Sequence, residues 1–151
     1  MALFALRDRY LDVDVERTRV AYGETAESGA DRCSCKYCQN FVLARNDVFS
    51  PQARETLALL GIDWRVEGEV IIVGRPDEYG FYRYLGWFHL AGAYLPEETA
   101  ELTQSFTDIS SQLDQVTLYP AAGHSSPGFP RFKDEIEIHF MTKLPWLLGG
   151  R

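Results

Sequence analysis

Three cysteines lie within six residues of one another, at Cys33, Cys35 and Cys38. Structural zinc sites use four thiolate or imidazole ligands arranged as a tetrahedron, and two cysteines separated by two residues commonly supply half of the set. Cys35 and Cys38 have that spacing, and Cys33 is close enough to reach the same ion from the extended chain before them. The pattern therefore predicts a metal site at these three thiols, with zinc as its ion.

The cysteines alone do not supply the fourth ligand of such a site, because the chain contains only three of them. A histidine, an acidic side chain or a partner chain would have to complete the tetrahedron. Asp31 is near the cysteines along the chain. The histidines are distant: His89, His124 and His139. A site that keeps three protein ligands and one open position has the geometry of catalytic zinc.

Two other interpretations of the cysteines stay open. Cys35 and Cys38 open a predicted helix, and a helix N-terminus lowers the pKa of a thiol there and favours disulfide exchange. A thioredoxin-like enzyme would place this motif in a βαβ unit, whereas here one strand and a long loop precede it. The thiols would be inert if they were simply packed in the core, because cysteine is among the most buried residue types.

The spacing of apolar residues predicts two helices after the first cysteines. Four apolar residues that recur every three or four positions define a helix over 36–48: Tyr37, Phe41, Ala44 and Val48. A second helix over 51–60 is marked by Ser50 as its N-cap, by Pro51 at its first position and by Gly61 after its end. We therefore expect the cysteines to lie where a loop enters the first helix.

The rest of the chain shows the patterns that are typical of strands. Residues 13–22 alternate with one break, which predicts a strand with a bulge or two short strands. Residues 23–32 are small, polar and acidic, which predicts an exposed loop. Further strands are predicted at 70–73, 81–94, 116–119 and 136–140. Because strands joined without intervening helices are antiparallel, we expect an α+β fold in which the two helices pack on a mostly antiparallel sheet.

Two of the predicted strands carry aromatic and titratable side chains on one face. Trp87 and His89 share a face of the most apolar strand, where they either line a binding cleft, with Trp87 as a ligand-binding residue, or pack in the core. A buried histidine usually has a backbone or carboxylate partner, so core packing is the commoner arrangement. On the last strand, polar residues alternate with apolar ones and are expected to be exposed: Glu135, Glu137 and His139.

Composition and charge limit the classes of function. The 151 residues are 46% hydrophobic and 25% charged, which is typical of one globular domain spanning 1–151. With 15 basic and 22 acidic residues, the net charge of −7 disfavours binding to nucleic acid or to anionic membranes and suits a basic protein partner. The N-terminal residues lack the pattern of an export signal, so we expect a cytoplasmic protein with reduced thiols.

Four segments of the chain resemble those of a group of small uncharacterised bacterial proteins. The segments are Cys33-Ser34-Cys35-Lys36-Tyr37-Cys38-Gln39-Asn40-Phe41, Leu60-Gly61-Ile62-Asp63, Gly86-Trp87-Phe88-His89 and Leu144-Pro145-Trp146-Leu147-Leu148. The resemblance implies a bacterial cytoplasmic protein in which the cysteine segment and the strand with Trp87 and His89 belong to one feature. It therefore favours His89 as the fourth metal ligand.

These observations predict a soluble, non-enzymatic binding module whose cysteine turn is clamped by zinc. Small acidic bacterial proteins of the immunity type, which neutralise a toxin, offer an analogy for such a module with a basic partner. The alternative is an enzyme that uses Cys35 and Cys38 as a redox pair, or one that uses the thiols as ligands of an open metal site.

Overall fold

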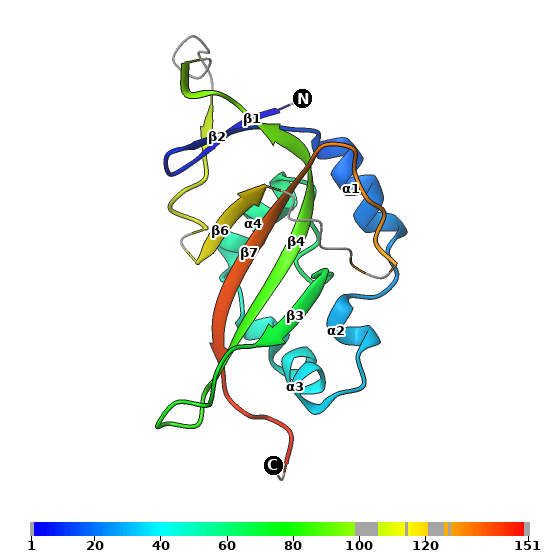
Figure 1. The fold of residues 1–151 in the computed structure, drawn as a ribbon, viewed down its shortest axis with the longest axis vertical. Helices are drawn as coiled ribbons and strands as arrows, with labels where there is room; N and C mark the ends of the chain where they lie inside the picture. Colours follow the sequence, from blue (N-terminus) through cyan, green and yellow to red (C-terminus); the bar gives the residue numbers. More distant parts are fainter. Residues whose placement is uncertain (1, 99–105, 114, 121–125, 127, 150–151) are drawn as a thin grey trace.

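One mixed sheet of seven strands dominates the computed structural model, which describes every residue except 1, 99–105, 114, 121–125, 127 and 150–151 (Figure 1). Within the described residues the strands are β1 (Ala2–Leu6), β2 (Arg9–Val13), β3 (Glu69–Ile72), β4 (Tyr82–Tyr94), β5 (Thr107–Asp108), β6 (Val116–Pro120) and β7 (Glu135–Leu144). Their order is β5-β1-β2-β4-β7-β6, and β3 pairs with β4 beside that path. Every pair is antiparallel except the short β1–β5 pair, so the predicted α+β fold with a mostly antiparallel sheet is confirmed.

The helices of the described residues precede most of the sheet. They are α1 (Val15–Glu24), α2 (Gly29–Arg32), α3 (Lys36–Ala44), the 3-10 helix η1 (Arg45–Asp47) and α4 (Pro51–Leu59). The helix predicted over 36–48 is confirmed as α3 continued by η1, and the helix predicted over 51–60 is confirmed as α4. The Ser50 hydroxyl caps α4 by accepting a hydrogen bond from the Ala53 N–H at 3.1 Å. None of the described helices is long and apolar enough to cross a membrane.

The helices α3 and α4 cover one face of the sheet, which we call the inner face (Figure 1). Phe41 of α3 and Phe49 after η1 pack against Phe140 of β7, with ring centroids 6.2 and 5.2 Å apart. Phe88 of β4 and Leu57 of α4 are fully buried in the same core. The opposite, outer face of β4 and β7 has no helix over it in this view, and the alternation of the strands places Trp87, His89, Glu135 and Glu137 there.

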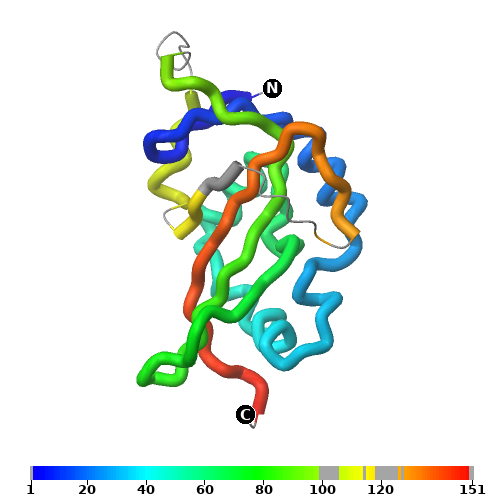
Figure 2. Tube along the Cα trace, viewed as in Figure 1, coloured from blue at the N-terminus to red at the C-terminus, as the bar shows by residue number. Residues whose placement is uncertain are grey.

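The segment after β7 docks on α3, as Figure 2 shows for the red end of the chain beside the cyan helix. The buried Asn40 amide donates to the Pro145 carbonyl oxygen at 3.0 Å and accepts from the Leu147 N–H at 2.6 Å. The Trp146 ring lies 5.9 Å from the Tyr37 ring. The C-terminal segment therefore holds the helix that begins at the cysteines.

The strand predicted over 13–22 is wrong beyond Val13, because the chain turns into α1. The Asp14 carboxylate caps this helix by accepting from the Arg17 N–H at 3.1 Å. The buried residues of α1 are Thr18, Ala21 and Tyr22. Residues three and four positions after Thr18 lie on the same side of a helix as Thr18. The apparent alternation was misleading because it counted Val20, which is 51% exposed, as a buried position.

This helix fills a gap in the sheet between β2 and β3, which both pair with the same edge of β4. The Tyr22 hydroxyl accepts from the His89 N–H and donates to the His89 carbonyl oxygen, both at 3.0 Å. The Thr18 hydroxyl accepts from the Ala91 N–H at 3.0 Å, and the Asp14 N–H donates to the Ala91 carbonyl oxygen at 2.9 Å. Groups of α1 and its cap thus replace the hydrogen bonds of a missing strand.

The loop predicted over 23–32 is also corrected, because it contains the short helix α2. Ser28 and Asp31 form a reciprocal capping box, in which each side chain accepts a hydrogen bond from the backbone N–H of the other. Gly29 is buried and its N–H donates to the Glu67 carbonyl oxygen at 2.9 Å. A small, polar segment therefore packs here, because its own side chains cap its backbone.

Candidate metal centre

The three cysteines lie at the start of α3, where the sequence predicts a helix to begin, but the short helix α2 precedes them instead of the predicted loop. Cys33 follows α2, Cys35 is the N-cap of α3, and Cys38 is in the first turn. The sulfur atoms of Cys33 and Cys35 are 3.2 Å apart, and all three sulfurs lie within 4.8 Å of one another. Thiolates bound to one tetrahedral zinc at 2.3 Å would be about 3.8 Å apart. The sulfurs therefore converge to nearly the separation that a single ion requires.

The ionisation of Cys35 and Cys38 is pushed in opposite directions. Burial opposes ionisation of the Cys35 thiol, but hydrogen bonds from the Cys38 backbone N–H and from the neighbouring thiols outweigh it and lower the pKa of Cys35. Burial and the two neighbouring thiols raise the pKa of Cys38. Cys35 is exposed and Cys38 is buried, so the sulfur that ionises first is the one that solvent reaches.

Asp31 is not available as the fourth ligand. Its carboxylate accepts from the Ser28 N–H at 3.1 Å and lies 3.3 Å from Arg45 Nη2. Arg45 Nη2 also donates to Ser28 Oγ at 2.8 Å and to Glu67 Oε1 at 3.0 Å. This network ties the segment before the cysteines to the chain before β3, and it uses Asp31 for structure.

His89 does not join the cysteines either. Its Nε2 is 2.7 Å from Ser126 Oγ and its Nδ1 is 3.3 Å from Glu135 Oε2, so both ring nitrogens face other groups. The structure thus brings together three of the four predicted metal ligands, Cys33, Cys35 and Cys38. Within the described part of the chain these three form a cluster without a fourth histidine, cysteine or carboxylate ligand. His124 lies outside the described residues.

Trp87, predicted as a ligand-binding residue, lies buried on the outer face of the sheet. Its ring stacks on that of His139, with centroids 5.5 Å apart and planes 28° from parallel. His139 is in turn 2.8 Å from Glu137 Oε1. The structure therefore places Trp87 beside a row of titratable groups.

That row contains Glu135 and Glu137, which the alternation of the last strand predicts to be exposed. The side chains of Glu135 and Glu137 are only 3% and 0% exposed. Phe129 and Phe132, in the segment before β7, are buried as well, and the Phe129 ring stacks on that of His89, with ring centroids 5.0 Å apart. Two phenylalanines in an otherwise Gly-, Ser- and Pro-rich segment were the sequence signal that this segment folds back on the sheet.

The chain from α2 connects the cysteines to this row. Gly68, next to the hydrogen-bond partner of Gly29, lies so close to His89 that an added Cβ would be 2.9 Å from its Nε2 and 2.4 Å from Ser126 Oγ. The Arg32 side chain, adjacent to Cys33, packs against Gly128. The segment that contains α2 and the segment before β7 therefore meet next to Cys33.

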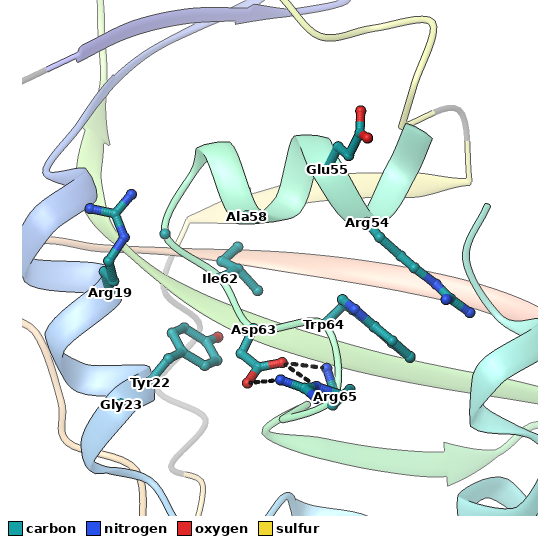
Figure 3. Close-up of a pocket in the computed structure, with 11 residues that line it drawn as sticks. Arg19, Tyr22, Gly23, Arg54, Glu55, Ala58, Ile62, Asp63, Trp64 and Arg65 are labelled. Atoms are coloured by element: carbon teal, nitrogen blue, oxygen red, sulfur yellow. Dashed lines mark hydrogen bonds and ion pairs between the residues drawn. The ribbon is translucent and has the colours of Figure 1, made fainter. Parts of the chain in front are cut away.

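A pocket of about 500 Å³ lies apart from both groups, between α1 and α4 (Figure 3). The arginine side chains that line it already have partners within the chain. Arg65 pairs with Asp63 at 3.1 Å, and the Arg54 guanidinium lies 4.0 Å from the centre of the Trp64 ring. The pocket is lined by neither cysteine nor histidine, so the metal-ligating chemistry of the described residues lies elsewhere.

Comparison of the chain with protein families, with curated proteins and with solved structures finds no match. The site must therefore be interpreted from its own geometry.

Proposed function

We propose that this protein is a non-enzymatic binding module that holds one zinc ion through Cys33, Cys35 and Cys38. The convergence of three sulfur atoms at the start of α3 is the observation that supports it. Thiolates are preferred zinc ligands, and the lowered pKa of Cys35 favours the form that binds metal. The ion would fix the junction of α2 and α3, which otherwise depends on weak thiol hydrogen bonds.

In this proposal the fourth position of zinc lies on the solvent side, because Cys35 is exposed and Cys33 is half-buried. Water or a side chain of a partner would complete the tetrahedron. The net charge of −7 supports a basic protein as that partner, since opposite charge speeds association. Three free thiols are typical of the reducing cytoplasm, where we place the protein.

The zinc content of purified, untagged protein tests the proposal. We expect about one zinc per chain, which is lost in Cys35→Ser and in Cys38→Ser, and a lower melting temperature after chelation, since metal binding stabilises the folded site. Ser34→Ala is the matched control, because it changes the same turn without removing a sulfur. Zinc-free wild-type protein after refolding with excess zinc would overturn the proposal.

A thiol-dependent redox enzyme is the second candidate, favoured by the difference between Cys35 and Cys38. An exposed thiol of lowered pKa beside a buried thiol of raised pKa suits the attack of Cys35 on a substrate disulfide, followed by attack of Cys38 on the mixed disulfide. The substrate disulfide gains two electrons and two protons, and Cys35 and Cys38 become a disulfide. Mass spectrometry of the metal-free protein, equilibrated with oxidised and reduced glutathione, would show this pair if the candidate is right.

An enzyme with an open metal site is the remaining alternative within the same cluster. Three thiolates and a free fourth position would let zinc bind and activate a water molecule. This alternative is supported because, among the described residues, the cluster has no fourth ligand. A zinc-dependent hydrolysis of simple ester substrates, lost in Cys35→Ser, would distinguish it from a structural zinc.

A further inference from the structure

We propose that His89, Glu135 and Glu137 form a second metal site, for a divalent ion harder than zinc such as Mn²⁺ or Fe²⁺. One ligand atom from each of the three side chains lies within 4.8 Å of the other two. Ligands bound to one ion at about 2.1 Å are about 3 to 4 Å apart, so small side-chain rotations would bring the three to a common ion. The site is distinct from the cysteines and does not depend on them.

The pairing of two strands builds this cluster. His89 of β4 lies opposite Glu137 of β7, and Ala91 lies opposite Glu135. Directly opposed residues of an antiparallel pair project from the same face of the sheet, which here is the outer face.

The second observation that supports a metal at this cluster is the burial of Glu135 without hydrogen-bond partners among the described residues. Its side chain is 3% exposed, and neither of its carboxylate oxygens accepts a hydrogen bond in the described part of the chain. His89 Nδ1, 3.3 Å from Glu135 Oε2, is also buried without a hydrogen bond. Burying an ionised carboxylate is costly unless a counter-charge accompanies it. A divalent cation between His89 Nδ1, Glu135 and Glu137 would supply that charge and would bind the Glu135 oxygens and Nδ1, which have no hydrogen bond within the described residues.

The surroundings of the cluster are those of a metal site. Metal-binding histidines usually hydrogen-bond through their other ring nitrogen to an orienting group, and ligating carboxylates are hydrogen-bonded in turn. His89 has Ser126 Oγ at 2.7 Å from Nε2, which leaves Nδ1 for the ion. Glu137 Oε1 has His139 Nε2 at 2.8 Å. We therefore assign Ser126 and His139 as positioning residues.

The donor set selects the kind of ion. Carboxylate oxygens suit Mn²⁺, Mg²⁺ and Ca²⁺, whereas imidazole suits first-row transition metals. One imidazole with two carboxylates is therefore best matched by Mn²⁺ or Fe²⁺. The cysteine cluster offers only soft sulfur ligands, so the two sites would sort different metals within one small chain.

Titration of Mn²⁺ into the chain with Cys33, Cys35 and Cys38 all replaced by serine tests the site without the thiolates. Calorimetry and the electron paramagnetic resonance of Mn²⁺ should both show one bound ion per chain. Glu135→Gln should abolish this binding, and Ser126→Ala should weaken it by about 10- to 100-fold, as the loss of an orienting group does at metal sites. Glu69→Gln is the matched control. Glu69 of β3 pairs with Trp87 of β4 and therefore lies on the same face of the sheet as the cluster, but it is not part of the cluster.

Thermal unfolding gives a second measurement. Mn²⁺ should raise the melting temperature of the cysteine-free chain and leave that of its Glu135→Gln variant unchanged. If the cysteine-free chain does not fold, wild-type protein loaded with one zinc is titrated with Mn²⁺ instead. A cluster that holds only a proton between His89 and Glu135 would bind no Mn²⁺. That result, or binding that persists in Glu135→Gln, would overturn the second site and leave the zinc content of the cysteines as a separate question.

Discussion

The chemistry of the cysteine cluster depends on an asymmetry between residues three positions apart. Cys35 is exposed at the N-cap of α3, where the Cys38 N–H donates to its sulfur at 3.4 Å. Cys38 is buried, and its thiol is surrounded by the two sulfurs with which it would share an ion. The neighbouring sulfurs oppose ionisation of Cys38, whereas a shared cation would favour the ionisation of all three thiols. The cluster is therefore a better metal site than a set of free thiols.

Alkylation of the metal-free protein at neutral pH should modify Cys35 well before Cys38. The lowered pKa of Cys35 and its exposure give it more thiolate at a given pH than the buried Cys38 thiol has. Iodoacetamide labelling followed by peptide mass spectrometry measures both rates, and one equivalent of zinc should suppress the faster one. Equal rates for the two thiols would show that the asymmetry is absent in solution.

Glu67 should make the fold less stable as the pH rises above about 4.5, its usual pKa. Burial raises the pKa of Glu67 in the folded protein, although Arg45 lies 3.0 Å away. A carboxyl group whose pKa is higher in the folded state stabilises the fold below its unfolded pKa, and this contribution is lost as the pH passes through the folded pKa. The free energy of unfolding of the wild type should therefore fall relative to that of Glu67→Gln as the pH rises above about 4.5. A difference that stays constant as the pH rises, measured by urea unfolding, would exclude the effect.

At the scale of elements, α1 is the segment in which the sequence was most misleading. Alternating Val13, Val15, Val20 and Tyr22 suggested a strand, and the chain does bring this segment to the edge of β4. Asp14 stops β2 by capping a helix, and the hydrogen bonds that a strand would have supplied come from Thr18 and Tyr22 instead. Such a replacement depends on tertiary contacts, which local periodicity does not contain.

Tyr22→Phe tests whether α1 replaces the missing strand. The change removes a hydroxyl that both donates to and accepts from the backbone of His89, and it leaves two buried backbone groups without partners. We expect the free energy of unfolding to fall by about 1 to 3 kcal/mol, the usual cost of such groups. Tyr79→Phe is the control, because Tyr79 is 79% exposed. Denaturant unfolding of the two variants measures the difference. Equal stability would show that water hydrogen-bonds to the backbone of His89 as well as the Tyr22 hydroxyl does.

At the scale of the whole molecule, strong local signals were the ones that predicted structure correctly. The helix spacing of Phe41, the Ser50-Pro51 start of α4 and the alternation of the last strand all specify their elements within a few residues, and the structure confirms them. The cysteines also lie together as their spacing predicts, because a short turn leaves them little freedom.

The second cluster escaped prediction because it is assembled over long distances. Glu135 and Glu137 look exposed in an alternating strand, but their side chains are buried on the face where Phe129, from the segment before β7, stacks on His89. His89 meets them through the register of β4 and β7, which the sequence of either strand alone does not reveal. The same long-range packing places Gly29 of α2 against Gly68, which in turn contacts His89, although the two clusters share no ligand.

X-ray absorption at the zinc edge, on protein loaded with one equivalent of zinc, tests directly whether the ion binds to the three cysteines. We expect three sulfur atoms at about 2.3 Å from the ion and one lighter atom, oxygen or nitrogen, in the fourth position. A shell of oxygen and nitrogen alone would contradict this expectation, because the ion would then lie away from Cys33, Cys35 and Cys38.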